Sequence, residues 1–133
     1  MPDRDPDHWL YRLDAQQWLA AADNELAAAR RAALARQQRA AVAQARRAAG
    51  MALNALLYTV PDPAYGRSYM DHLRALAQDA SVPERIRQAA QALLDMPLRQ
   101  ELVVLGRPSA AIAEPAATII DYVRGLMMPP VQA

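Results

Sequence analysis

The stretch that decides the fold runs from Asp14 to Pro61 and reads DAQQWLAAADNELAAARRAALARQQRAAVAQARRAAGMALNALLYTVP. Apolar residues recur in it at steps of three and four, which is the period of an amphipathic helix. The first run contains Trp18, Leu19, Ala22, Leu26, Ala29 and Ala33, and the second contains Val42, Ala45, Ala49, Leu53 and Leu56. One continuous helix would leave this apolar stripe without a partner. We therefore predict two long antiparallel helices, the first capped by Asp14 and ending at about residue 34, the second ending before Pro61, with a tight turn near 35–39.

The segments on either side of this hairpin are shorter. Residues 1–7 carry two prolines and three aspartates and predict a flexible lead-in, and Trp9, Leu10 and Leu13 predict a short helix over 8–13. Thr59 to Gly66 is rich in loop-forming residues. Ser68 and Asp71 form a capping-box pattern for a helix over about 69–79, and Ser81 and Glu84 repeat it for a helix to about Asp95.

The last third of the chain predicts one more helix. Pro97, Gly106 and Pro108 bracket Leu98 to Leu105, which is either extended or a short helix. Ser109 or Glu114 then opens a final helix that ends at Pro129 and Pro130. Its inner face is predicted to contain Ile112, Ala116, Ile119, Ile120, Val123 and Leu126.

The composition agrees with an all-α fold. The chain has 133 residues, only 4 glycines and no phenylalanine, and its apolar mass is alanine and leucine, which favour helices over strands. We predict an up-and-down bundle of about five helices in one domain over 8–128, with a tail at 129–133.

Several classes of protein are excluded by residue type. There is no cysteine and there are 2 histidines, so we expect no disulfide, no metal site and no cofactor. The formal charge of +1 is too small by itself to indicate an anionic partner. No long uncharged apolar stretch occurs and the first residues are acidic, so we expect no membrane span, no signal peptide and a cytoplasmic location.

The charges are unevenly distributed along the chain. Six arginines and no acid occur between residues 30 and 47. Helical geometry projects Arg36, Arg39, Arg46 and Arg47 to one side, which continues through Gly50 to Asn54. Such a stripe predicts a phosphate-binding surface. Alternatively, the arginines are solvated or neutralised by acids of the preceding helix or of a second subunit, and Asn54 is a buried or interface amide with satisfied hydrogen bonds.

Three motifs resemble the HEPN family of small helical bundles. They are Ala52-Leu53-Asn54-Ala55-Leu56-Leu57, the Asp71-His72-Leu73 triplet, and the run from Trp18 to Leu26. The likeness covers roughly residues 14 to 96, although the order of Asp71 and His72 is inverted relative to the family. It implies a homodimer that binds nucleotide or RNA. Many family members are also metal-independent ribonuclease toxins that pair with a nucleotidyltransferase.

The resemblance places an arginine and a histidine of the ribonuclease type at Arg67 and His72. Arginine can hold a phosphate and imidazole can exchange a proton near neutral pH, which suits strand cleavage by a ribose hydroxyl. In ribonuclease members this motif lies on a later helix, whereas here it opens a middle one. The alternative is that Arg67 lies on the loop surface and that His72 bonds a backbone carbonyl or the Asp71 region under the bundle.

The tyrosines near this loop have two interpretations. Tyr58, Tyr65 and Tyr69 cluster around the segment that contains Arg67, where they either pack or stack on a base, and we place Tyr69 in the predicted binding site. The sequence as a whole predicts a non-catalytic HEPN-like module that binds nucleotide or RNA or docks to a partner. The first alternative is a ribonuclease toxin, and the second is a purely structural protein-interaction module.

Overall fold

The chain folds into a bundle of α-helices. The computed structural model describes residues 13–96 and 109–127. Its elements are α1 (Ala15–Leu34), α2 (Gln38–Thr59), the 3-10 turn η2 (Pro63–Tyr65), α3 (Tyr69–Gln78), α4 (Glu84–Asp95), the 3-10 turn η4 (Ser109–Ile112) and α5 (Glu114–Met127). This confirms the predicted all-α fold, with two long antiparallel helices at its start.

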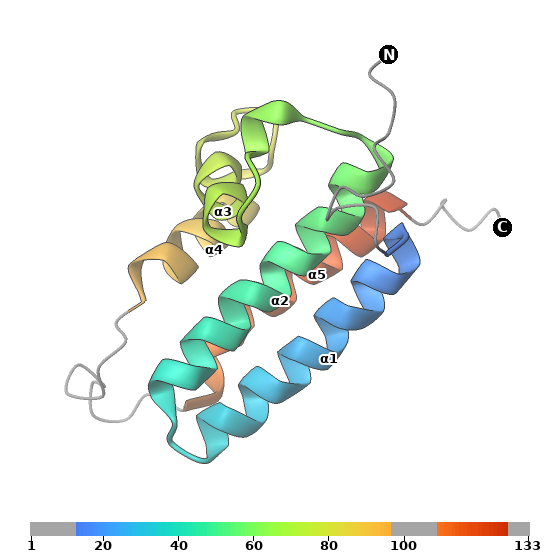
Figure 1. Ribbon diagram of the computed structural model, residues 1–133. Coiled ribbons are helices and arrows are strands. Elements are labelled where there is room, and N and C mark those ends of the chain that lie inside the picture. The colour runs from blue at the N-terminus through green and yellow to red at the C-terminus, as the bar shows by residue number, and fades with distance from the viewer. Residues whose placement is uncertain (1–12, 97–108, 128–133) are drawn as a thin grey trace, which may run out of the picture.

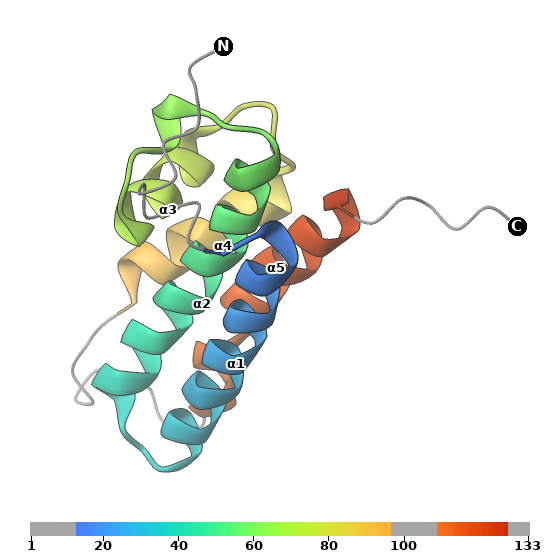
Figure 2. The same cartoon turned by 45° about the vertical axis from the view of Figure 1, so that its right-hand side comes forward.

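Helix α2 is the centre of the arrangement. Helices α1 and α5 pack along one side of it and α3 lies toward the other, while α4 packs mainly against α3 and α5, as Figures 1 and 2 show from two directions. Because α2 contacts all four other helices, most of its length is buried. The buried positions of α2 include Gly50 and Asn54, so the side of α2 that the arginine stripe was predicted to follow becomes interior at its later end.

Two helices begin where the sequence pattern placed them. At α1 the backbone N–H of Gln17 donates to Asp14 Oδ1 at 2.8 Å, and the N–H of Asp14 donates to Gln17 Oε1 at 2.9 Å. At α3 the N–H of Asp71 donates to Ser68 Oγ at 3.0 Å. Each bond satisfies a backbone donor that the first turn of a helix leaves without an intrahelical partner, which fixes the starting residue.

The predicted cap of α4 by Ser81 is wrong. Pro83 is the N-cap, and no side chain bonds to the first turn. The Ser81 hydroxyl instead donates to Asp79 Oδ1 at 2.6 Å. The reason is local, since Asp79 offers a charged acceptor two residues away, which makes a stronger bond than a neutral one.

The turn between α1 and α2 has the hydrogen bonds of a Schellman motif. The N–H of Gln37 donates to the carbonyl of Ala32 at 2.9 Å, and that of Arg36 to Ala33 at 3.1 Å. The residue in the left-handed conformation is Arg36, with φ of 60°, where glycine is usual. This confirms the hairpin near 35–39 and explains why no glycine marked it in the sequence.

Replacing Arg36 with glycine is expected to stabilise the fold by about 1 kcal/mol, because glycine adopts a positive φ without the steric cost that a side chain incurs. Denaturant unfolding of the two proteins measures the difference. Arg36→Ala is the matched control, since it removes the guanidinium and keeps the Cβ. Equal stability of the glycine and alanine variants would show that the turn conformation has no cost.

Small residues allow the long helices to pack closely. Ala22, Ala29, Ala45, Ala49 and Ala52 are fully buried, and they belong to one core cluster with the leucines and isoleucines of α3, α4 and α5. The predicted inner faces of α1 and α2 are therefore confirmed for most positions. Leu56 is only half-buried.

One predicted core residue of α5 lies outside the core. Leu126 is 55% exposed, whereas Ala116, Ile119, Ile120 and Val123 on the same stripe are buried. The last turn of α5 projects beyond the helices on which it packs (Figure 2), so nothing in the described part of the chain covers that position.

Several predictions concern residues outside the described ranges. They are the lead-in at 1–7, nearly all of the short helix over 8–13, the segment from Leu98 to Leu105, and the end of the last helix at Pro129 and Pro130.

Candidate functional site

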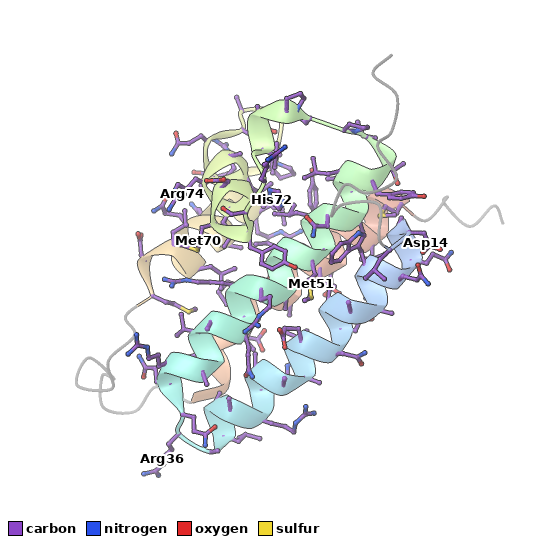
Figure 3. The ribbon with its side chains drawn as sticks, viewed as in Figure 1. Asp14, Arg36, Met51, Met70, His72 and Arg74 are labelled. Carbon is purple, nitrogen blue, oxygen red and sulfur yellow. The ribbon has the colours of Figure 1, made fainter. Side chains whose placement is uncertain are left out.

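His72 is fully buried, in the first turn of α3 (Figure 3). Its Nδ1 lies 2.7 Å from the carbonyl oxygen of Tyr65, and its Nε2 lies 2.8 Å from Oδ1 of Asn54 on α2. The imidazole therefore connects the loop after α2 to the later turns of α2 itself. This is the arrangement that the alternative interpretation of His72 predicted, with a backbone carbonyl as its partner.

The left-handed backbone of Gly66 helps to form this contact. Gly66 has a φ of 68°, and a Cβ at this position would come within 2.7 Å of the Asp71 Cβ. Only glycine fits a positive φ so close to another side chain. The turn it makes brings the preceding Tyr65 carbonyl back over the first turn of α3.

Burial lowers the pKa of His72, although its hydrogen bond to the Tyr65 carbonyl and the charge of Asp71 act in the opposite direction. A neutral ring carries one N–H, which the Tyr65 carbonyl accepts from Nδ1. Nε2 then requires a donor, which Asn54 supplies when its amide rotates by half a turn. Asn54 Nδ2 has no hydrogen-bond partner in its present orientation. The rotation gives that buried donor a partner and satisfies the imidazole at the same time.

Because burial holds the folded-state pKa of His72 below its unfolded value, the unfolded chain binds a proton that the folded chain does not. Stability should be complete above about pH 6.5 and should fall as the pH drops below it, by at most about 1.4 kcal/mol per pH unit. Denaturant unfolding at a series of pH values measures this slope.

The control for the pH experiment is the other histidine of the chain. His8→Gln should keep the slope, and His72→Gln should lose it. A protein that becomes more stable on acidification from neutral pH would show instead that the folded state holds His72 protonated between two carbonyl oxygens.

Arg67 does not share a water-accessible cleft with His72. Arg67 is exposed in the loop, while the His72 ring is 0% exposed and both of its nitrogens face protein atoms. Proton exchange with a bound strand requires a ring that the strand can reach. The geometry therefore does not favour the pair as a ribonuclease site.

Arg46 is bound within the protein. Its Nε donates to the carbonyl of Leu93 at 2.8 Å, and one terminal nitrogen donates to the carbonyls of Leu94 at 3.2 Å and Met96 at 3.3 Å. These are the carbonyls at the end of α4, which no intrahelical donor reaches. Burial lowers the pKa of this guanidinium. Arg46 caps another helix, so it is not available to an external phosphate.

Arg47 faces a different neighbour. Its Nε lies 2.7 Å from Glu25 Oε2 on α1, which is the neutralisation by the preceding helix that the sequence left open. Adjacent residues of a helix point about 100° apart, so Arg46 contacts α4 while Arg47 contacts α1. The predicted arginine stripe therefore does not form one continuous surface. Asn54, at its end, is 0% exposed.

Tyr69 has a packing role. A Cβ placed on Gly50 would come within 2.5 Å of the Cβ and Cγ of Tyr69, so the tyrosine lies directly against the backbone of α2. The other predicted members of the site are exposed at the start of α2: Arg36 in the turn and Arg39 in the first helical turn. Arg30 and Arg31 at the end of α1 are exposed near the same turn.

We define the basic end as Arg30, Arg31, Arg36 and Arg39. No acid occurs between residues 26 and 61, so neither helix of the hairpin places a carboxylate among these arginines. The side chain of Gln37, the N-cap of α2, makes no capping bond to the first turn. Sequence reasoning counted Arg30 and Arg31 in the arginine-rich segment but placed only Arg36 and Arg39 of this group in the predicted site, because it followed one face of α2 alone.

Over residues 13–96 and 109–127, no group of three or more histidine, aspartate or glutamate side chains could hold a metal ion. None of the helices described has the length and apolar character needed to cross a bilayer.

The chain matches no protein-family model, no curated protein and no solved structure. The HEPN resemblance therefore depends on the quoted motifs alone, and the function has to be argued from the geometry above.

Proposed function

We propose that this protein is a non-catalytic RNA-binding module of the HEPN-like type, and that RNA binds at the basic end. One observation carries the proposal: four exposed arginines lie around the turn between α1 and α2, on helices with no acid from residue 26 to residue 61. The site is smaller than the predicted one, because Arg46 and Asn54 are engaged inside the bundle and Arg47 is paired with Glu25.

The chemistry of these groups fits a phosphate backbone. A guanidinium donates to phosphate oxygens in a fixed planar fork and stays charged at any physiological pH. The acid nearest to this end along α5 is Glu114, which follows η4, and η4 contacts both α1 and α2. Along α5 this is the acid that the described residues place near the arginines of the basic end.

The scarcity of exposed aromatic residues there predicts the mode of binding. The residues of the basic end and their neighbours from Ala29 to Ala41 include no tyrosine or tryptophan, so base stacking does not contribute. Binding should then be electrostatic, with little preference for sequence and a strong dependence on salt.

The test is fluorescence anisotropy with a short unstructured single-stranded RNA over a series of salt concentrations. Contact with three or four phosphates predicts a slope of log K against log salt of roughly −2 to −3. The double variant Arg31→Glu with Arg39→Glu should lose at least about tenfold in affinity at low salt and should flatten the slope.

The matched control is Arg67→Glu with Arg85→Glu, which reverses two exposed charges away from the hairpin turn and includes a residue of the predicted site. It should bind RNA nearly as the wild type does. An equal loss in both double variants would show that net charge alone drives binding. Displacement by polyglutamate at the same concentration of charge would indicate an acidic protein partner in place of RNA.

The same samples test the ribonuclease alternative. Without added metal the RNA should be recovered intact, because the only described histidine is enclosed. Cleavage that His72→Ala abolishes would contradict the proposal and would establish the enzyme. The homodimer and the nucleotidyltransferase partner implied by the resemblance stay predictions that this binding mode does not require.

A further inference from the structure

A cavity of about 190 Å³ opens at the opposite end of α2 from the basic end. It lies where the last turns of α2 meet η2, the end of α3, the turn before α4, and α5. Its apolar lining includes Leu53, Leu56, Leu57 and Leu76, and its polar lining consists of Asp62, Tyr65, Asp79, Ser81 and Tyr122. Sequence reasoning assigned nothing to this place, because its walls come from five separate segments.

The charged groups that line the cavity are both acids. Asp62 and Asp79 contribute carboxylates, and no arginine belongs to the lining. Both carboxylates act on one phenol: burial raises the pKa of the Tyr65 hydroxyl, and its bond to Asp79 and the charges of Asp79 and Asp62 raise it further. Both acids line the same cavity, and the Tyr65 hydroxyl donates to Asp79 there.

Asp79 is held in place as an ionised group. Its Oδ2 accepts from the Tyr65 hydroxyl at 2.7 Å, and its Oδ1 accepts from the Ser81 hydroxyl at 2.6 Å and the Ser81 N–H at 3.0 Å. The Ser81 and Tyr65 bonds lower its pKa, and Arg87 adds a weaker charge effect. A carboxylate offers about four lone-pair positions, so three accepted bonds leave capacity for one more donor.

We infer that this cavity binds a small organic cation, a primary ammonium attached to an unbranched or flat apolar group. The ammonium donates to Asp79 and Asp62, and the apolar group lies against the leucine side chains. Charge and shape act together, since the acids exclude carboxylates and phosphates while the leucines favour a hydrocarbon chain over a fully hydrated metal ion. The site is separate from the basic end in position and in the sign of its charge.

The experiment titrates the full chain with n-alkylamines of increasing length and follows binding by calorimetry and by backbone amide shifts. Affinity should rise about fourfold for each methylene that becomes buried and should stop rising once the chain fills the cavity. The n-alcohols of the same lengths are the matched ligands without charge, and they should bind at least about tenfold more weakly.

Two variants test the acids, because each keeps an oxygen acceptor for the local turn while it removes the charge. Asp79→Asn and Asp62→Asn should each weaken amine binding by about tenfold and leave alcohol binding unchanged. Asp121→Asn, which removes a charge next to Tyr122 but outside the lining, should bind as the wild type does.

Substitution at Asp62 disturbs the fold less than substitution at Asp79, because Asp62 is exposed. Among the bonds described, its side chain accepts only one, from the Ala64 N–H at 3.0 Å. Circular dichroism verifies that each variant is folded. Equal affinity for amines and alcohols, amine binding that neither variant weakens, or shifts confined to residues outside the lining would overturn the inference.

Discussion

Gly50→Leu is expected to destabilise the protein by about 3 kcal/mol or more, because it forces α3 away from α2. A Cβ on Gly50 would come within 2.5 Å of the Tyr69 Cβ and Cγ and closer still to Cδ1. These atoms are at the base of the tyrosine, so a rotation of the ring alone does not make room. The backbone of α3 has to move, and it carries His72 away from Asn54 with it.

The measurement is the free energy of unfolding from denaturant titration, together with the imidazole signals of His72 in NMR spectra. Gly125→Leu is the matched control, since Gly125 is also helical and a Cβ there meets nothing within 4 Å. It should gain up to about 1 kcal/mol from the higher helix propensity of leucine.

A second variant separates steric conflict from other causes. Tyr69→Gly removes all three atoms that a Cβ on Gly50 would meet, so Gly50→Leu made in that background should cost much less than it does in the wild type. Additive losses would contradict the contact. A Gly50→Leu protein with wild-type stability and an unchanged His72 signal would contradict the close approach of α3 to α2.

Arg46→Met is expected to destabilise the protein by about 3 kcal/mol, since it removes charge-assisted hydrogen bonds to three carbonyls and leaves those partly buried acceptors without a donor. Helix α4 has no basic residue in its last turn and ends at Met96 without a glycine. Its C-terminal carbonyls therefore depend on a side chain from α2. Methionine keeps much of the length and packing of the arginine stem.

The adjacent residue gives the control. Arg47→Met breaks an ion pair in which the arginine side chain is 46% exposed, and it should cost at most about 1 kcal/mol. Arg46→Lys should lose an intermediate amount, because one ammonium cannot span the positions that a guanidinium reaches. Hydrogen exchange in the last turn of α4 should speed up in Arg46→Met and stay unchanged in Arg47→Met.

Arg46→Met also distinguishes the structural role of Arg46 from its predicted role in binding. Folded Arg46→Met should bind RNA nearly as tightly as the wild type, because its guanidinium is bound to α4 and not to solvent. A destabilisation no larger than that of Arg47→Met would contradict the capping role. A large loss of RNA affinity in the folded variant would return Arg46 to the binding surface.

The positions of the helices could be predicted because their signals are local. The period of the apolar residues from Trp18 to Leu56 and the capping pairs at Asp14 and Ser68 involve residues within one or two helical turns of each other. Ser81 shows the limit of this reasoning. It matches the pattern of a cap, but a nearby carboxylate competes for its hydroxyl.

The candidate sites could be predicted only in part. The concentration of arginines before residue 48 was visible, yet which of them remain exposed depends on where α4 ends and on where Glu25 lies. The cavity gave no signal at all, since Asp62 and Asp79 are separated in sequence and come to line one cavity only in the folded chain.

The sequence by itself determined that this chain is helical, where its longest helices begin and end, and that its positive charge is concentrated around one hairpin. Only the tertiary structure decided the role of each polar side chain: Arg46 as the cap of α4, Arg47 as the partner of Glu25, His72 as a buried bridge to Asn54. The physical reason is that helix formation depends on neighbours a few residues away, whereas the surroundings of a side chain depend on which distant helix packs against it.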